Sequence, residues 1–228
     1  MFTFIRCFIG LATFLALPAL AELPTSDSAR PRAGQPVITP VPSVSVALTH
    51  MSGAPMSVRA LQEKGLDPAG DRNVDLVTYA TTEAYPSGTQ FKLTVQTAGP
   101  TYLYAISSDE LNRTTRLFPA TQSTDNSPLV AAQSVTRLPA DNRSFTLPQQ
   151  PGSAYVLVLV ADKALDVDAL VAKLRTTPGD FKKKVYTLLG NDLIAPTAIR
   201  YDPAQAASAV FGTPAGSIVP MLVAVRHR

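Results

Sequence analysis

Alternating hydrophobic and polar residues mark the centre of this chain as a series of short β-strands. Phe91, Leu93 and Val95 alternate with polar residues, the period-two pattern of a strand with one face in water. The next run, residues 101–106, carries apolar residues on both faces, which indicates an inner strand. Because the connection between the two runs is short, we expect them to pair as an antiparallel hairpin.

The same signals predict strands over much of the remaining chain. Residues 154–161 (AYVLVLVA) form a continuous apolar run of the kind found in a protein core. The other predicted strands, each bounded by turn residues, cover residues 44–49, 74–79, 114–118, 135–138, 144–147 and 217–225.

Helical periodicity is concentrated in the last third of the chain. One helix has an apolar stripe at i, i+3, i+4 and i+7, formed by Val167, Leu170, Val171 and Leu174, and Asp166 is placed to cap it. A second begins at Thr177-Pro178, has Phe181, Val185 and Leu188 on one side and ends at Gly190. A third covers residues 203–211, between Asp202 and Gly212. Residues 57–64 also fit a short helix, capped by Ser57 and stopped by Gly65.

Several consecutive motifs resemble a known family. They are a Tyr-Pro-x-Gly-x-x-Phe-x-Leu strand from Tyr85, a Tyr-Leu-Tyr strand from Tyr102, Leu117-Phe118-Pro119, a polar loop with Asn126, Leu138-Pro139 and a Pro151-Gly152 turn. Over roughly residues 75–162 this pattern resembles the domain of unknown function numbered 4384. The resemblance implies an immunoglobulin-like β-sandwich, found in bacterial exported or multidomain proteins, and it supplies no catalytic residues.

Together, the pattern and the resemblance predict a mainly β protein, an immunoglobulin-like antiparallel β-sandwich with about three peripheral α-helices. We assign the sandwich to residues 44–162. Residues 163–228 are expected to add helices and a C-terminal strand to the same domain, since the final strand fits the same sheet.

The first 21 residues have the features of a secretory signal peptide. Arg6 supplies the positive charge, residues 7–20 the apolar segment, and Ala19-Leu20-Ala21 the small residues of a cleavage site at Ala19 and Ala21. A retained membrane anchor is the alternative, but Pro18 interrupts the segment and it is shorter than the roughly 20 residues that a spanning helix needs. We therefore expect a periplasmic or extracellular protein that has no stable membrane anchor after cleavage.

Cleavage would also change the chemistry available to the chain. It removes Cys7, the single cysteine, so disulfides and thiolate ligands are excluded from the mature protein. It removes Arg6 as well, leaving 19 basic against 17 acidic residues, which gives no electrostatic argument for nucleic acid. The Pro-rich residues 22–43 are expected to form a flexible tail, with a docking peptide as the alternative.

The residues that can carry chemistry form no catalytic motif. Neither G-x-S-x-G nor H-E-x-x-H occurs, and His50 and His227 are expected to be ordinary surface histidines at strand ends. Asp71, Asn73 and Asp75 have the spacing of a calcium loop, but Leu76 occupies the place of its glycine. We expect no cofactor and no metal.

Two further groups have a structural and a binding interpretation. Lys182, Lys183 and Lys184 are expected to form a solvated helix face. Tyr85, Tyr102 and Tyr104 fit half-buried strands, and they also form a possible partner-binding surface, because tyrosine gives contact area at low entropic cost.

The sequence therefore favours an exported, non-catalytic binding or adaptor module of the bacterial cell envelope. Its expected partner is another envelope protein, in an assembly of undetermined oligomeric state. The alternatives are an envelope hydrolase acting on carbohydrate or peptide polymer, and a ligand-binding sandwich without turnover, which would need an aromatic-lined pocket.

Overall fold

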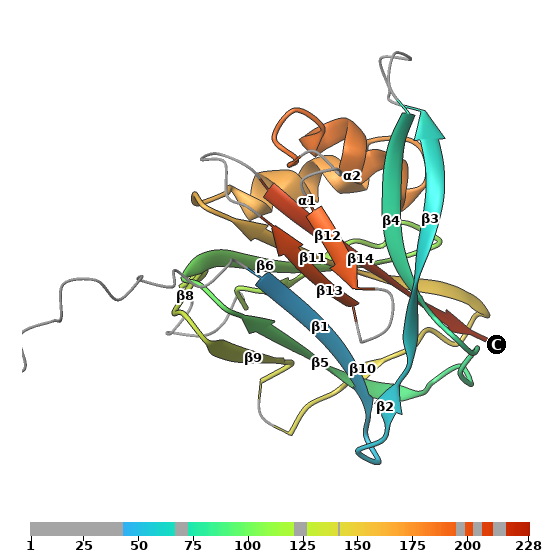
Figure 1. Cartoon of the computed structure of the whole chain (residues 1–228). Coiled ribbons are helices and arrows are strands. Elements are labelled where there is room, and N and C mark those ends of the chain that lie inside the picture. The colour runs from blue at the N-terminus through green and yellow to red at the C-terminus, as the bar shows by residue number, and fades with distance from the viewer. Residues whose placement is uncertain are drawn as a thin grey trace, which may run out of the picture. The chain divides into compact units, whose positions relative to one another are not determined.

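The computed structural model of the chain describes residues 43–66, 73–120, 127–140, 142–194, 199–202, 207–211 and 218–228. All of them belong to one compact unit, residues 39–228. Within it, the strands form two sheets and two helices pack beside one of them (Figure 1). The fold of the described residues is therefore mainly β.

Sheet A is built around the first strand of the chain. Its order is β10 (Phe145–Thr146), β5 (Gln90–Thr97), β1 (Ser43–His50), β13 (Ala207–Phe211) and β12 (Ile199–Asp202), with β2 (Pro55–Met56) on β1 and β9 (Ser134–Leu138) on β5. Every one of these pairs is antiparallel.

Sheet B is built around the last strand of the chain. Its order is β3 (Val58–Leu66), β4 (Asn73–Thr81), β14 (Ile218–His227), β11 (Gly152–Ala161), β6 (Thr101–Asp109) and β7 (Thr115–Phe118), with β8 (Leu129–Val130) on β6. The pair of β14 with β4 is parallel, and the others are antiparallel. β11 thus has a full antiparallel partner on each side.

The two sheets share one hydrophobic core. Sheet A contributes the alternating side chains of β1 and β5, among them Val46 and Leu93, and sheet B contributes Val158 of β11 and Val223 of β14. All four side chains are almost completely buried. The period-two pattern of β5 is therefore confirmed: its apolar side faces sheet B.

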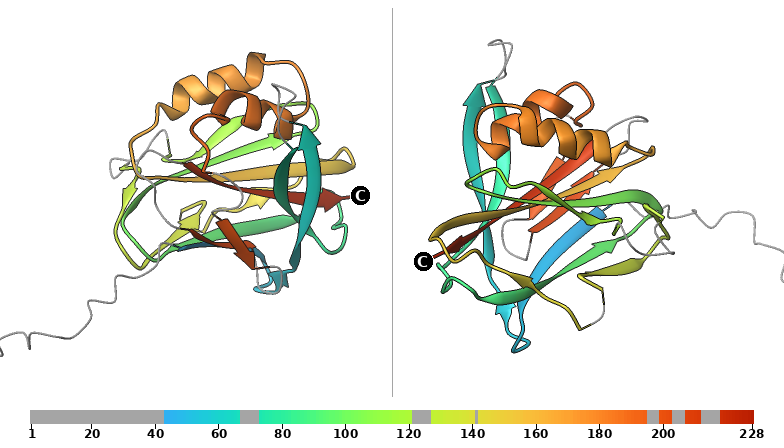
Figure 2. Two further views of the ribbon diagram at one scale, coloured as in Figure 1. Left: turned by 45° about the horizontal axis from the view of Figure 1, so that its top comes forward. Right: turned by 180° about the vertical axis from the view of Figure 1, so that it is seen from behind.

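A second core lies on the other face of sheet B. It joins Leu157 and Leu159 of β11 to the buried stripes of α1 (Val167–Thr176) and α2 (Phe181–Leu189). Figure 2 shows both helices on this side, so that sheet B lies between them and sheet A. The continuous apolar run of β11 has this physical cause, because alternate residues fill two different cores.

The two helices follow the predicted apolar stripes closely. The backbone N–H of Ala169 donates to Oδ1 of Asp166 (2.9 Å), so the predicted cap of α1 is confirmed. Helix α2 begins at Phe181, three residues after Pro178, and is capped by Asp180. Neither helix, at 10 and 9 residues, is long and apolar enough to cross a membrane.

The predicted hairpin between residues 91–96 and 101–106 is wrong. β5 pairs in sheet A with β1, β9 and β10, whereas β6 pairs in sheet B with β11, β7 and β8. The short connection through Gly99 crosses from one sheet to the other, because the apolar side of each strand contributes to the shared core. Short length alone did not distinguish this crossing from a hairpin.

Two predicted helices are also wrong. Residues 58–66 form β3, which pairs with β4 over nine residue pairs, and residues 207–211 form β13, which pairs with β1 and β12. Both segments are rich in alanine or other good helix formers, but pairing with neighbouring strands overrides that propensity. Residues 203–206 lie outside the described residues. The described part of the chain therefore has two helices where the sequence predicts about three.

Candidate functional site

The three tyrosines proposed as a partner-binding surface lie at separate places. Tyr102, at the start of β6, pairs with Ala161, whereas Tyr85 forms a parallel bridge with His227. Ala161 and His227 lie at opposite ends of the β11–β14 pair, roughly 30 Å apart for ten residues of strand. The structure therefore does not bring Tyr85 and Tyr102 together.

Tyr104 has a structural environment. It is 1% exposed and belongs to the core beneath the helices. Its hydroxyl oxygen accepts a hydrogen bond from the backbone N–H of Leu165 (2.7 Å), just before α1. Burial raises the pKa of Tyr104, while this hydrogen bond acts in the opposite direction. A neutral phenol thus fixes the entry to α1, and this side chain offers no surface to a partner.

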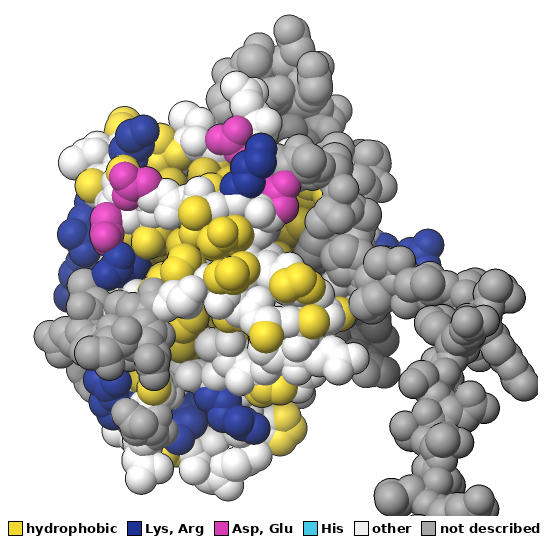
Figure 3. Space-filling view, turned by 90° about the vertical axis from the view of Figure 1, so that its left-hand side faces the viewer, with side chains coloured by type: hydrophobic (Ala, Val, Ile, Leu, Met, Phe, Trp, Pro, Cys, Tyr) yellow, Lys and Arg dark blue, Asp and Glu magenta, His cyan; other side chains and the backbone are white. Residues whose placement is uncertain are grey.

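Tyr102 lies beside an exposed hydrophobic end of the sheets. Leu129 of β8 pairs with Tyr102 and is 52% exposed, while Val135 of β9 is 46% exposed. Two connections between the sheets, from β5 to β6 and from β8 to β9, lie side by side here. The N–H of Gln133 in the second donates to the carbonyl of Ala98 in the first (3.3 Å). Figure 3 shows hydrophobic side chains gathered across the middle of this side of the molecule, with acidic and basic groups above them and basic groups below.

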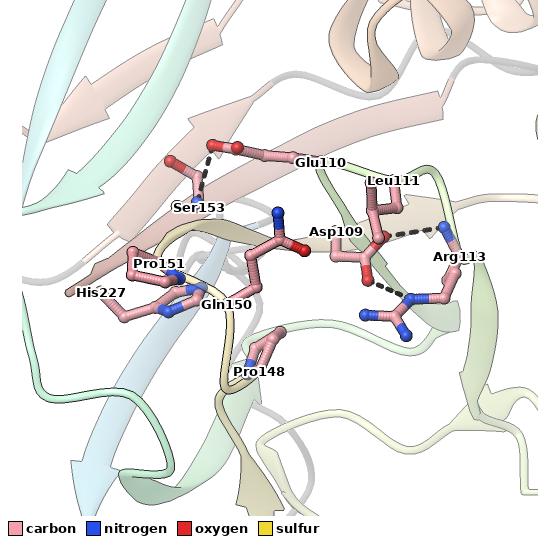
Figure 4. Close-up of a pocket in the computed structure, with 10 residues that line it drawn as sticks. Asp109, Glu110, Leu111, Arg113, Pro148, Gln150, Pro151, Ser153 and His227 are labelled. Carbon is pink, nitrogen blue, oxygen red and sulfur yellow. Dashed lines mark hydrogen bonds and ion pairs between the residues drawn. The ribbon is translucent and has the colours of Figure 1, made fainter.

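A small hollow lies at the opposite end of β6 and β11 (Figure 4). The loop after β6, the loop before β11 and the end of β14 line it. Its volume is about 50 Å³. Pockets for small organic ligands typically hold about 300–1,000 Å³, so this hollow has room for a few water molecules and not for a drug-sized ligand.

Both carboxylates of the hollow have structural partners. Asp109 accepts hydrogen bonds from Nε of Arg113 (2.6 Å) and from its backbone N–H (2.9 Å). Glu110 accepts from the backbone N–H of Ser153 (2.8 Å). A Cβ on Gly152 would lie 2.7 Å from Oε2 of Glu110, and the φ of Gly152 is +154°, so only glycine permits this approach. Glu110 therefore ties the loop after β6 to the start of β11.

His227 is buried at the edge of the hollow, so the prediction of a surface histidine is wrong for this residue. It is 5% exposed, because the segment from Tyr85 to Ser87 runs alongside the end of β14. Nδ1 of His227 lies 3.1 Å from the hydroxyl of Ser87. Burial lowers the pKa of His227, and the negative charge of Glu110 partly offsets that effect. The imidazole is thus favoured in its neutral form.

Ser87, His227 and Glu110 include the residue types of a nucleophile, a base and an acid. Nucleophilic catalysis needs the base to be oriented by a third group and the nucleophile to be open to substrate. Here Glu110 accepts a hydrogen bond from the backbone N–H of Ser153, and the adjacent hollow measures only about 50 Å³. The arrangement fits a structural anchor for the C-terminus better than a catalytic centre. Among the described residues, no group of three His, Cys, Asp or Glu side chains is placed to bind a metal ion.

The lysine run is only partly solvated. Lys183 has a side chain that is 80% exposed, but Lys184 is only 3% exposed, which contradicts the predicted solvated face. Nζ of Lys184 donates to the carbonyl of Leu174 (3.2 Å) in the last turn of α1. Carbonyls there lack partners within the helix, and a cation is favoured at that end of the helix dipole. Lys184 thus joins α2 to α1.

Sequence reasoning missed both Lys184 and the contacts around the hollow. Ser87 and His227 are 140 positions apart, and no sequence period links them. The burial of Lys184 could have been predicted, because it lies one residue before Val185 and three after Phe181, on the buried side of the helix. Ala19, Ala21 and Asp71 lie outside the described residues, and so do the side chains of Asn73 and Asp75.

Comparison with known proteins gives one match. No curated protein and no solved structure matches the chain. Residues 84–164 match the family model described as Domain of unknown function (DUF4384). The resemblance predicted over roughly residues 75–162 is confirmed, and the chain carries a DUF4384 domain over residues 84–164.

Proposed function

We propose that this protein is an exported, non-catalytic binding or adaptor module of the bacterial cell envelope, and that it binds another envelope protein through the end of the sheets that carries Leu129. The supporting observation is the exposure of Leu129 on β8 beside the half-buried Tyr102, next to two crossings between the sheets that a hydrogen bond joins. Exposed apolar side chains next to tyrosine are typical of protein-binding surfaces.

The small volume of the hollow supports a macromolecular partner over a small ligand. A ligand-binding sandwich would need an aromatic-lined pocket, whereas prolines and polar side chains line this hollow of about 50 Å³. Protein–protein contacts need no deep pocket and bury about 800 Å² on each partner. The end of the sheets that carries the exposed Leu129 and Val135 is the surface we assign to such a contact.

The test is site-specific photo-crosslinking in the native envelope. A photoreactive amino acid at position 129 should give a discrete crosslinked partner, and one at position 111 should not. Leu111 is the matched control because it is 61% exposed at the other end of β6. With the photoreactive amino acid placed instead at position 135, where Val135 is 46% exposed at the same end, Leu129→Asp should abolish capture of that partner while Leu111→Asp retains it. Equal capture from both positions would refute the proposed surface.

Export is a separate part of the proposal. It rests on the apolar segment before Ala19-Leu20-Ala21. Mass spectrometry of the protein from the periplasmic fraction should give a chain beginning at Glu22. A full-length chain in the membrane fraction would favour the retained anchor instead.

A second candidate, an envelope hydrolase, has the contact between Ser87 and His227 in its favour. We expect no hydrolysis of envelope carbohydrate or peptide polymers by the purified protein. Hydrolysis that Ser87→Ala abolishes, with the fold intact, would establish the hydrolase instead.

The immunoglobulin-like form of the sandwich is also a proposal. Its support is the core shared by two largely antiparallel sheets. The parallel pair of β4 and β14 departs from an all-antiparallel sandwich. An experimental structure compared strand by strand with immunoglobulin domains would decide it.

A further inference from the structure

Strand β3 is a long edge of sheet B. It has nine residues and pairs with β4 along one side (Figure 1). Among the described residues, no strand pairs with its other side. An open edge of this length is a template for another strand, and proteins usually protect such edges.

The register of β3 shows which backbone groups face the open side. The N–H of Thr82 donates to the carbonyl of Ser57 (2.9 Å), and this pair continues the register in which Val58 lies opposite Thr81. In an antiparallel ladder, alternate residues exchange hydrogen bonds with the neighbour. The odd-numbered residues of β3 therefore bond to β4, and the even-numbered residues, such as Ala60 and Gln62, direct N–H and C=O outward.

We propose that two copies of this chain form a dimer by antiparallel pairing of their β3 strands about a two-fold axis at Leu61. In this register Ala60 of one copy exchanges hydrogen bonds with Gln62 of the other, and Val58 does so with Lys64. Arg59 then lies opposite Glu63 of the second copy, twice by symmetry. The pairing gives about eight backbone hydrogen bonds, and an isologous dimer of this kind closes the edge.

Charge selects this register among those that the backbone allows. Axes at Arg59 or at Glu63 place like charges directly opposite each other, which destabilises strand pairing. Axes at Ala60 or Gln62 leave both charged residues opposite uncharged ones. The axis at Leu61 alone, within residues 59–63, pairs arginine with glutamate on both sides.

The faces of β3 agree with this arrangement. Val58 and Ala60 pack against the core shared by the sheets, whereas Arg59 is exposed. Arg59 thus lies on the face away from that core, and Glu63 occupies a position of the same odd parity along the strand. Cross-strand ion pairs there need no burial of charge, and the joined strands would extend sheet B into one continuous sheet across two copies.

This dimer does not depend on the proposed adaptor function. It uses β3, whereas the proposed partner surface lies at Leu129 on β8. Photo-crosslinking at position 129 therefore tests the adaptor function alone, and measurement of the oligomeric state tests the dimer alone.

Sedimentation equilibrium of the purified full chain tests the dimer. We expect concentration-dependent dimerisation, with Arg59→Glu or Glu63→Arg each raising the dissociation constant on the order of 30-fold. The double variant R59E/E63R restores opposite charges in the same register and should return the dissociation constant close to that of the unmodified protein. Thermal unfolding checks that each variant is folded.

A further variant tests the backbone hydrogen bonds between the β3 strands of the two copies. Gln62→Pro removes an N–H that faces the open side without taking a donor from the β3–β4 ladder, so it should weaken the dimer while Gln62→Ala does not. An unmodified protein that stays monomeric at about 100 μM, weaker than most specific protein complexes, would overturn the proposal. A dimer that survives Arg59→Glu and Gln62→Pro, or that R59E/E63R does not restore, would overturn it as well.

Discussion

The two sheets of this protein differ in how many of their faces are covered. Sheet B has a core on each face, one shared with sheet A and one beneath α1 and α2. Sheet A has a core on one face, and its other face carries exposed polar residues such as Gln96 and Arg137. The sequences of the strands show this difference: apolar and polar residues alternate in β5, whereas β11 is apolar from Ala154 to Ala161. A continuous apolar strand therefore implies a third layer and not only a central position.

The same comparison shows what the DUF4384 segment needs from its flanks. Residues 84–164 supply β5 to sheet A and β6 and β11 to sheet B. The main partners of β5 and β11 are β1 and β14, and both come from outside the segment. In this chain, residues before and after the family match thus complete both sheets.

The largest expected effect is the difference in stability between substitutions on a buried face of sheet B and on the solvent-exposed face of sheet A. Leu157→Ala, on the helix side of sheet B, should lower the free energy of unfolding by about 2–5 kcal/mol, because it leaves a cavity where the side chain is fully buried. Gln96→Ala, on the open face of sheet A, should change it by less than about 0.5 kcal/mol. Urea unfolding of the two variants provides the measurement. Similar losses would mean that the helices do not seal sheet B.

Much of this fold was predictable, because the order of apolar and polar residues along a strand or helix indicates which of its faces are buried. The stripes of α1 and α2 and the strands β1 and β5 were predicted from periodicity, β6 and β11 from apolar runs without alternation, and β14 as a closing strand. The failures came where tertiary pairing decided: β3 and β13 have sequences compatible with helix, and the connection at Gly99 crosses between sheets. The contact of Ser87 with His227 joins distant parts of the chain, so no local pattern carries it.

A second prediction concerns the link between the two covering helices. Lys184→Met keeps most of the buried stem but leaves the carbonyl of Leu174 without its donor, which should cost about 1–3 kcal/mol of unfolding free energy. Lys183→Met is the control, since Lys183 is exposed and its ion pair with Asp180 spans 3.6 Å. Chemical unfolding of both variants measures the difference. Equal stability would show that the buried ammonium contributes nothing to holding α2 on α1.

A third, smaller effect concerns the start of the helix layer. Asp166→Ala removes the acceptor for the N–H of Ala169 and should lower the unfolding free energy by about 1 kcal/mol. Asp166→Asn keeps a side-chain oxygen for the cap and should recover most of that loss. Thermal unfolding resolves the two variants. If Asn and Ala were equally destabilising, the charge at this position, and not its hydrogen bond, would carry the effect.

The smallest effect concerns the end of β14, where the segment from Tyr85 to Ser87 buries His227. Burial lowers the pKa of His227, so the unfolded chain takes up a proton at higher pH than the folded protein does. Stability should therefore be complete above the ordinary histidine pKa of about 6.5 and should fall as the pH drops below it. His227→Gln should remove this part of the pH dependence, whereas His50→Gln, on the half-buried histidine that ends β1, should retain it. Unfolding free energies at a series of pH values between about 5 and 8 make the comparison, with the carboxylate contribution common to all three proteins. An unchanged slope in His227→Gln would mean that the end of β14 opens to water before the rest of sheet B unfolds.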